Sequence, residues 1–266
     1  CCSMSQDLQG LTANQVVSAM GLPSAAMVNQ RVPKKMLLEN GVPTAADRKL
    51  IQDHIEQVTW VAALKPANAG VPDFNDAQRT YLEVAVLTVA MRDLGGPPPN
   101  STKVRRISEL LHRAIPYPVV VVLSEGEHLF MSMCHIRWAQ KEVDKTVLDG
   151  EPSFAMLVTD EFCSAFLAAL TMSQQPRANL YALYQGWIDT LSAWQAANVS
   201  GRFALSQSPA HAAERRAALQ RCRELDARID SLRSAASKEK QLARQVAANL
   251  KIKALLAERQ RVATNV

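Results

Sequence analysis

The chain of 266 residues lacks the features that mark membrane, secreted and disulfide-rich proteins. No apolar run reaches the roughly 18 residues that a membrane-spanning helix needs, and the N-terminus lacks the basic-then-apolar layout of a signal peptide. The five cysteines include no C-x-x-C pair, so a disulfide framework is not expected. We therefore expect reduced, mostly buried thiols in a cytoplasmic protein that does not contact a membrane.

Recognisable catalytic motifs are missing as well. The sequence contains no P-loop, no glycine fingerprint of a Rossmann fold and no nucleophile elbow. Cys134 and His135 are neighbours in a strand-like run, and neighbours in a strand point to opposite faces, so the two cannot hold one metal ion together. The remaining histidines, which have no partners at ligand spacing, are His54, His112, His128 and His211. We therefore expect no catalytic residue, no metal ion and no cofactor.

One weaker pattern leaves a metal-dependent or degenerate nuclease open as an alternative. Asp73 precedes a strand-like run that carries Glu83, and such an acidic pair can hold Mg²⁺ in a nuclease. Those sites also place a lysine two residues after the second acid, where this chain has Ala85. The simpler expectation is an aspartate in a surface turn and a glutamate on the polar side of a strand.

The residues that are present predict an α+β domain over positions 1–150. Apolar residues make up 48% of the chain and charged residues 21%, an ordinary globular composition. Helices are predicted at residues 14–20, 34–40, 45–58 and 102–115, and strands at residues 58–66, 80–92, 118–124 and 127–138. Gly41 is expected to cap the second helix, and residues 95–101 to form a surface loop. This order predicts a small, mostly antiparallel sheet covered by helices.

From residue 151 onward the sequence predicts helices only. Residues 151–208 are expected to form a helical segment that packs on the first domain, with helices at residues 159–170 and 177–197. Thr159 is expected to cap the first of these helices. The segment 198–211 contains a glycine, three serines and a proline, and is expected to be a linker.

Residues 209–266 are expected to form a helical, coiled-coil-like tail. From His211 onward the sequence has no glycine, no proline and no aromatic residue. Apolar residues recur at steps of three and four, which is a heptad seam, along Cys222, Leu225, Ile229, Leu232, Ala236, Ala243, Val246 and Leu250. Glu239 and Lys253 interrupt the seam. One long helix and a hairpin bent at residues 234–238 both fit this spacing, and the Ser-Ala-Ala-Ser segment slightly favours two helices.

The tail also carries the positive charge of the protein. Residues 209–266 contain 13 Lys and Arg against 6 Asp and Glu, whereas residues 1–208 contain 17 against 19. The candidate residues for binding a nucleic acid or a protein partner are Arg31, Lys34, Lys35, Arg105, Arg106, Arg221, Arg228, Lys238, Lys240, Arg244, Lys251 and Lys253. The candidate seam for a partner helix consists of Leu225, Ile229, Leu232, Val246 and Leu250. Because the tail has no aromatic residues to stack on bases, protein packing is favoured over a sequence-independent nucleic-acid-binding module.

Four short motifs occur in order along the chain: GLP (21–23), RVPKK (31–35), TAADRKLIQDHIEQVTWVAALKP (44–66) and KEKQLARQVAANLKIKAL (238–255). In these motifs the chain resembles a bacterial family, domain of unknown function 4391. Members of that family are encoded beside helicases and DNA methyltransferases in restriction-like, anti-phage gene clusters. The resemblance therefore implies an accessory subunit of a DNA-targeting defence complex, and it transfers no catalytic residue.

Together these patterns predict a non-enzymatic adaptor that docks through its helical tail. The expected occupant of the tail is a helicase or DNA methyltransferase subunit, or a second copy of the chain, with DNA as a further contact. No membrane partner is expected.

Overall fold

The protein divides into two compact units in the computed structural model, which describes residues 10–40, 43–92, 101–140 and 145–266. The first unit covers residues 1–191 and the second covers residues 192–266. Helix α7 (Leu180–Ser200) passes from the first unit into the second. In the described part of the chain, no helix combines the length and the apolar character that a membrane span requires.

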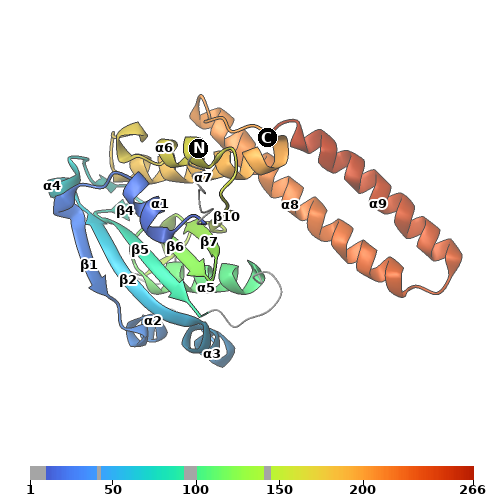
Figure 1. Ribbon diagram of the computed structural model, residues 1–266, viewed down its shortest axis with the longest axis horizontal. Coiled ribbons are helices and arrows are strands. Elements are labelled where there is room, and N and C mark those ends of the chain that lie inside the picture. The colour runs from blue at the N-terminus through green and yellow to red at the C-terminus, as the bar shows by residue number, and fades with distance from the viewer. Residues whose placement is uncertain (1–9, 41–42, 93–100, 141–144) are drawn as a thin grey trace, which may run out of the picture. The chain divides into compact units, whose positions relative to one another are not determined.

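A six-stranded sheet forms the centre of the first unit (Figure 1). In spatial order its strands are β1 (Met27–Arg31), β2 (Ile55–Leu64), β5 (Val84–Met91), β6 (Val119–Glu125), β7 (His128–Met133) and β10 (Ser153–Leu157). Neighbouring strands are antiparallel except β5 and β6, which are parallel and are connected through helix α5 (Ser101–Ala114). Two separate ribbons pair β3 (Phe74–Asn75) with β4 (Thr80–Tyr81) and β8 (Ile136–Trp138) with β9 (Thr146–Leu148). This arrangement confirms the expected α+β class.

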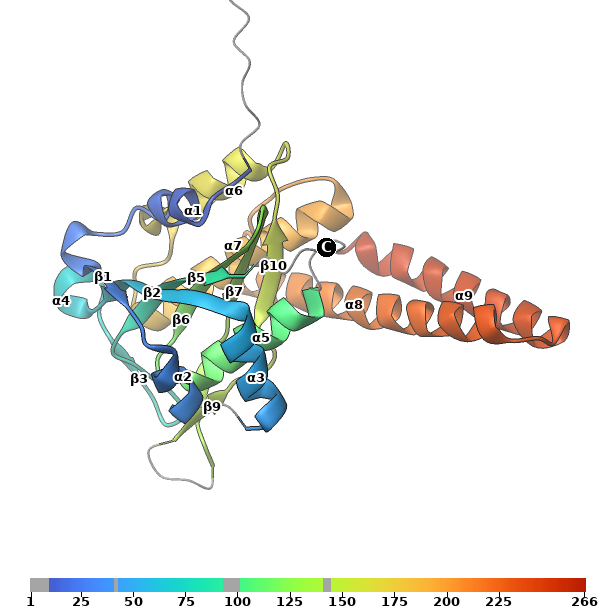
Figure 2. The same cartoon turned by 60° about the horizontal axis from the view of Figure 1, so that its bottom comes forward.

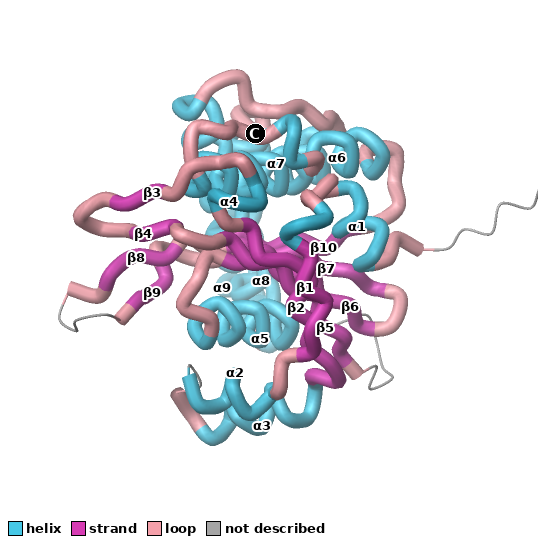
Figure 3. Tube along the Cα trace, turned by 90° about the vertical axis from the view of Figure 1, so that its left-hand side faces the viewer, coloured by secondary structure: helices cyan, strands magenta, loops and turns pink. Residues whose placement is uncertain are grey.

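Helices α2 (Lys34–Asn40), α3 (Ala45–His54) and α5 cover one face of this sheet (Figure 3). Alternate residues of a strand point to the same face, so Leu87 of β5 and Val121 of β6 enter one core together with Ile107 of α5. Thr44 caps α3 as expected, because its hydroxyl oxygen accepts the backbone N–H of Asp47 at 3.1 Å.

The opposite face of the sheet is covered by α1 (Ala13–Ala19), α6 (Cys163–Ala169) and the part of α7 that belongs to the first unit (Figure 3). Tyr184 of α7 joins this layer to the sheet. Its buried hydroxyl donates to the carbonyl of Val119 at 2.7 Å and accepts the backbone N–H of Cys134 at 2.9 Å. The shorter connecting elements are η1 (Ser24–Ala26), α4 (Pro66–Ala69) and η2 (Met172–Gln174). The sheet is therefore buried between two helical layers.

The two outermost strands differ from the sequence-based expectation. β1 and β10 were not predicted, and residues 151–158 were expected to be helical. Each strand has five residues and pairs with a neighbour on one side only. Four of the five residues of β1 are exposed, so no apolar run marks this strand in the sequence.

Helix boundaries also differ at two positions. Helix α3 ends at His54, so Ile55 and Val58 belong to strand β2 and not to the helix in which they were expected. Helix α6 begins at Cys163 with Phe162 as its N-cap, so Thr159 does not cap it. The predicted cap at Gly41 and residues 95–100 of the predicted loop lie outside the described residues.

The second unit contains a helical hairpin (Figure 2). Helix α8 (Pro209–Lys238) and helix α9 (Leu242–Ala263) pack side by side and run in opposite directions. Ser208 begins α8, because its hydroxyl oxygen accepts the backbone N–H of His211 at 3.1 Å. Of the two alternatives that the heptad spacing allowed, the structure therefore shows the hairpin and not one long helix.

Candidate protein-binding surface on the helical hairpin

The hairpin reverses at Glu239, one residue beyond the predicted bend. Its carboxylate Oε1 accepts the backbone N–H groups of Lys240 and Gln241, each at 2.9 Å. Its backbone carbonyl accepts the side-chain amide of Gln245 at 2.6 Å. Glu239, which interrupts the apolar spacing in the sequence, thus follows the last residue of α8, and its carboxylate binds the backbone N–H groups that precede α9.

Two ion pairs join α8 to α9 across the hairpin. Nη2 of Arg221 lies 2.5 Å from Oε1 of Glu258, and Nε of Arg259 lies 2.7 Å from Oδ1 of Asp226. The hydrogen bond from Arg221 holds the pKa of the Glu258 carboxyl below its usual value. These pairs fix the register of the two helices with residues of the hairpin itself.

The structure divides the expected apolar seam between two surfaces. Leu225 and Ile229 of α8 are buried, and Leu232 is half-buried. On α9 the buried apolar residue of the middle turns is Ile252, whereas Val246 and Leu250 are 50% and 64% exposed. The predicted seam assumed one continuous helical spacing through residues 239–241. Because the helix is interrupted there, the residues of α9 that face α8 are not those that this spacing predicts.

The exposed apolar residues of α9 form a stripe that includes the side facing away from α8, at Val246 and Leu250, and reaches the flank of the buried side at Leu256. Leu250 and Ile252 are two residues apart, which is roughly 200° around an α-helix, so their side chains point to nearly opposite sides. The stripe consists of Leu242, Val246, Leu250 and Leu256, and each is at least 40% exposed. Single exposed apolar residues are common on protein surfaces, but four on one face of one helix are typical of an interaction site.

The tail cations predicted to bind a partner fall into two groups. Arg221 is engaged by Glu258 and Glu224, and Arg244 lies 3.7 Å from Glu239. The other members of the set, Arg228, Lys238, Lys240, Lys251 and Lys253, are exposed, as is Arg244. No ion pair joins Lys251 or Lys253 to another residue in the part of the chain that the structure describes. Of these cations of α9, Lys253 lies on the side that carries the exposed apolar stripe, and Lys251 lies on the opposite side.

The first basic group of the sheet domain lines a small cavity of about 330 Å³. Arg31 and Lys34 line it together with Glu56. Partial burial, followed by the charges of Arg92 and Arg31, lowers the pKa of the Lys34 ammonium, with Glu56 acting in the opposite direction. Lys35 is exposed and lies 3.7 Å from Glu39, one turn further along α2. The carboxylates of Glu56 and Glu39 therefore lie close to these basic side chains.

The second basic group, Arg105 and Arg106, contacts other side chains of the same domain. Arg106 forms two hydrogen bonds with the carboxylate of Asp47, at 2.9 and 3.0 Å, and a third with Glu109 at 2.8 Å. These bonds lower the pKa of Asp47 below its usual value. The guanidinium of Arg105 lies 4.7 Å from the centre of the Phe154 ring. Arg106 therefore connects α5 to α3, and Arg105 packs on strand β10.

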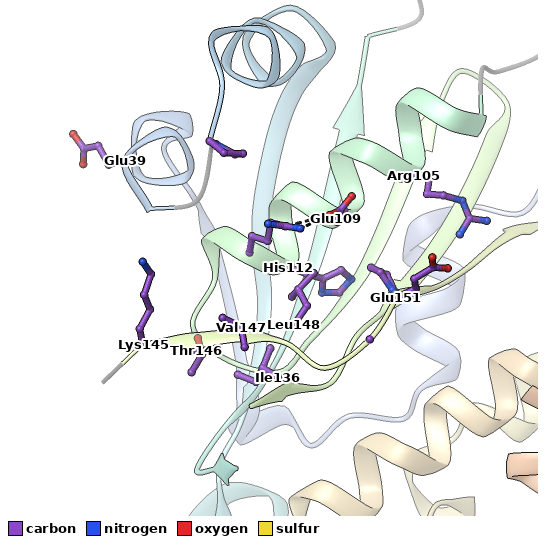
Figure 4. A pocket seen from close by; sticks show the side chains of 14 residues that line it. Glu39, Arg105, Glu109, His112, Ile136, Lys145, Thr146, Val147, Leu148 and Glu151 are labelled. Carbon is purple, nitrogen blue, oxygen red and sulfur yellow. Dashed lines mark hydrogen bonds and ion pairs between the residues drawn. The ribbon is translucent and has the colours of Figure 1, made fainter. Parts of the chain in front are cut away.

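A larger cavity of about 960 Å³ lies beside α5 and the β8–β9 ribbon (Figure 4). His112 lines it, but the imidazole is almost fully buried and Nε2 lies 2.9 Å from the hydroxyl of Ser132. The hydroxyl of Ser108 lies 2.5 Å from the same oxygen. Burial lowers the pKa of His112 to about 3, so the ring is neutral at pH 7. Both serines are fully buried, so this group has the character of a satisfied polar core.

The sequence analysis missed this polar group, although a signal for it exists. Ser108 and His112 are four residues apart on α5, so they lie on the same side of the helix. That side otherwise carries Ile107, Leu111 and Ile115. Two polar residues within an apolar stripe indicate a buried hydrogen-bonded pair or network.

The residues considered for metal binding have other partners. Both ring nitrogens of His135 are within hydrogen-bond distance of a side chain, Nδ1 of the Tyr81 hydroxyl at 2.5 Å and Nε2 of Oε1 of Gln185 at 2.8 Å. Glu83 forms an ion pair with Lys65 at 3.2 Å, and Asp73 is exposed. Within the described ranges, no group of three His, Cys, Asp or Glu residues could hold a metal ion.

The cysteines that the structure describes are free and buried. They are Cys134, Cys163 and Cys222. Burial raises the pKa of the Cys134 thiol to about 12, so this thiol is protonated at neutral pH.

The fold and this surface define an α+β protein that carries a basic helical hairpin with an exposed apolar stripe. The chain matches the family described as Domain of unknown function (DUF4391) over residues 20–258, and it belongs to this family. No curated protein and no solved structure matches the chain. The family match includes most of the hairpin, so the hairpin is part of what the family shares.

Proposed function

We propose that the protein is a non-enzymatic accessory subunit of a prokaryotic DNA-targeting defence complex, and that it docks on a helicase or DNA methyltransferase subunit through its helical hairpin. The observation that supports this most strongly is the stripe of Leu242, Val246, Leu250 and Leu256. Four apolar side chains exposed to water on one helix face are typical of a surface that binds a partner. The defence setting comes from the family resemblance.

The size of the stripe indicates what kind of docking it supports. Covering half or more of four aliphatic side chains contributes about 1 kcal/mol for each, or about 4 kcal/mol in total. That corresponds to about a thousandfold in affinity before the cost of association is subtracted. A stable complex therefore needs further contacts, which the exposed cations beside the stripe can supply.

Co-purification from the native host tests this function. The full chain carries an affinity tag, and recovered proteins are identified by mass spectrometry. We expect a helicase or methyltransferase subunit to be recovered with the wild type and lost with the double variant Val246→Gln/Leu250→Gln. The matched control is Ala227→Gln/Ser231→Gln, which places the same side chains four residues apart at exposed positions of α8. Recovery that the stripe variant leaves unchanged would refute docking through this surface.

A second candidate function, sequence-independent binding of DNA, is supported by the exposed cations of the tail. Lys238, Lys240, Lys251 and Lys253 are all exposed and can neutralise phosphates. This function predicts a mobility shift with duplex DNA that weakens steeply between about 50 and 200 mM salt. It also predicts a weaker shift for Lys251→Glu/Lys253→Glu and an unchanged shift for Val246→Gln/Leu250→Gln. A shift that is insensitive to salt and to the charge reversal would exclude it.

A further inference from the structure

The outer face of α9 combines an apolar stripe with charge of one sign. At about 100° per residue, Leu242, Val246, Leu250 and Leu256 fall within a sector of roughly 120°, and Lys253 falls inside the same sector. We call these five residues the outer α9 face. Lys251 and Arg244 lie about 100° and 120° beyond Leu250, toward the opposite side of the helix, so Lys253 is the cation of this face. From residue 240 to residue 257 the chain contains four basic residues and no acidic one.

We propose that the outer α9 face binds an amphipathic partner helix whose apolar stripe carries an aspartate or glutamate opposite Lys253. This inference rests on the proposed docking function and names the chemistry of the partner surface. The apolar side chains of such a helix would cover Leu242, Val246 and Leu250, in the manner of helix-in-groove recognition. A carboxylate of this helix would lie beside Lys253, where opposite charges select the partner and its orientation.

The charge pattern argues against a second copy of the chain as the occupant. Two outer α9 faces in contact would place Lys253 of both copies in one apolar interface, with no carboxylate of that face between them. Unpaired like charges within a helix pair disfavour that pairing. The two acidic residues of the helix-turn segment, Glu239 and Glu258, are already engaged within the hairpin.

A nucleic acid would account for the cations of α9 but not for its exposed apolar side chains. Phosphates would pair with the cations of α9, but a phosphate backbone offers no apolar surface for Leu242 and Leu250, which are 74% and 64% exposed. The tail also has no aromatic residue on which bases could stack. An acidic helix accounts for both the apolar stripe and the charges.

Two peptides of residues 241–263 test the proposal against the full-length protein. One has the native sequence, and the other carries Arg244→Glu, Lys251→Glu and Lys253→Glu. The two share every apolar side chain and differ in the sign of three charges, of which the one at position 253 lies on the outer α9 face. In both, a hydrocarbon staple that joins positions 241 and 245 holds the helix without touching the stripe. Binding to the wild-type protein is measured by fluorescence anisotropy.

We expect the charge-inverted peptide to bind at least tenfold more tightly than the native peptide at about 50 mM salt. This ratio should fall at about 500 mM, because salt screens exposed charges. In the protein, Val246→Gln/Leu250→Gln should weaken binding of the charge-inverted peptide at least tenfold, whereas the control Ala227→Gln/Ser231→Gln should not change it. Lys251→Glu/Lys253→Glu should reduce or reverse the preference between the peptides.

Three outcomes would overturn the proposal. Equal or stronger binding of the native peptide would indicate a second copy as the occupant. Binding of the charge-inverted peptide that survives Val246→Gln/Leu250→Gln would indicate a polyanion site of the kind that a nucleic acid uses. Failure of both peptides to bind would remove the outer α9 face as a helix-binding site.

These outcomes are separable from failure of the proposed function. If neither peptide binds while co-purification in the host still depends on Val246 and Leu250, the acidic helix is refuted and the docking function stands. If the charge-inverted peptide binds as expected while co-purification is insensitive to the stripe, the binding chemistry stands and the role in the complex is refuted.

Discussion

Arg106 shows why a basic residue near a helix start need not bind a ligand. Glu109, three residues on, is a local partner, but the partner that holds Arg106 by two hydrogen bonds is Asp47, 59 positions earlier and on another helix. Nothing in the spacing of charges along one helix reveals a pair between α3 and α5. Lys251 and Lys253 of α9, in contrast, have no acidic neighbour within a helical turn in the sequence, and both are exposed.

The Arg106 pair leads to a prediction on stability. Replacing Arg106→Met leaves the nearly buried carboxylate of Asp47 without its main partner. We expect the free energy of unfolding to fall by about 1–2 kcal/mol, less than for a fully buried pair because the arginine is partly exposed to water. Urea unfolding at pH 7 measures this, with Lys103→Met, at an exposed position of the same helix, as the control.

The same pair has a defined pH dependence. The pKa of Asp47 in the folded protein is below its usual value, so the folded state binds fewer protons at this group than the unfolded state. The stabilisation is therefore complete above a pH of about 4 and is lost as the pH falls through the folded pKa. The stability difference between the wild type and Arg106→Met should shrink below that pH. A constant difference down to a pH of about 2 would contradict this assignment.

The buried imidazole of His112 should make the free energy of unfolding depend on pH over a different range. Its pKa falls from an ordinary value of 6.5 to about 3 on folding, so below pH 6.5 the unfolded state takes up a proton that the folded state does not. The wild type should lose about 1.4 kcal/mol of stability per pH unit from this group as the pH falls from about 6 to about 4.

The variant His112→Gln tests this, because glutamine can keep a hydrogen bond to Ser132 and does not titrate. We expect it to be less stable than the wild type at pH 7, and its stability to fall less steeply with acid. The measurement is the free energy of unfolding in urea at several pH values. Parallel curves for the two proteins would show that His112 is not the group responsible.

At the scale of elements, the sequence predicted best where one local rule decides the outcome. Thr44 caps α3, and the buried face of α8 follows the heptad spacing through Leu225 and Ile229. The prediction failed where partners from elsewhere decide. β1 becomes a strand because β2 is beside it, and the inward side of α9 is set by the turn at Glu239. The candidate surface could therefore be assigned to the tail, but not to a face of α9.

The turn itself gives a prediction at this scale. Glu239→Ala removes the carboxylate that accepts two backbone N–H groups at the start of α9. We expect a loss of about 1 kcal/mol in the local stability of the hairpin, comparable with the loss of a helix cap. Amide hydrogen exchange should become faster in the first turns of α9 and stay unchanged in strands β5 and β6.

Lys240→Ala is the matched control for the turn, because the lysine side chain is exposed and its backbone N–H remains. Faster exchange throughout the protein, or the same change in both variants, would argue against a specific role for the carboxylate.

At the scale of the whole molecule, the distribution of charge is the feature that connects fold to function. Residues 1–208 are nearly balanced in charge, whereas residues 209–266 carry 13 basic and 6 acidic residues. In the hairpin, Asp226 and Glu258 join the two helices, and no acidic residue lies on the outer α9 face. The surface that exposes apolar side chains therefore carries the charge of Lys253 and no carboxylate.

This distribution predicts how two copies of the molecule behave. In the wild type, Lys253 on the outer α9 face of each copy opposes pairing of two such faces. A copy with Arg244→Glu, Lys251→Glu and Lys253→Glu keeps the stripe but presents the opposite charge. We expect an equimolar mixture of the wild type and this variant to form a one-to-one dimer through the outer α9 face at about 50 mM salt, as measured by sedimentation velocity.

The dimer should weaken at about 500 mM salt, where the Debye length falls to roughly 4 Å, and it should disappear when Leu250→Gln is added to both copies. The charge sets which surfaces meet, and the apolar stripe supplies the burial that holds them together. A dimer that forms equally well without opposite charges would mean that the stripe alone decides. A mixture that stays monomeric would mean that the outer α9 face cannot receive a helix presented on a folded protein.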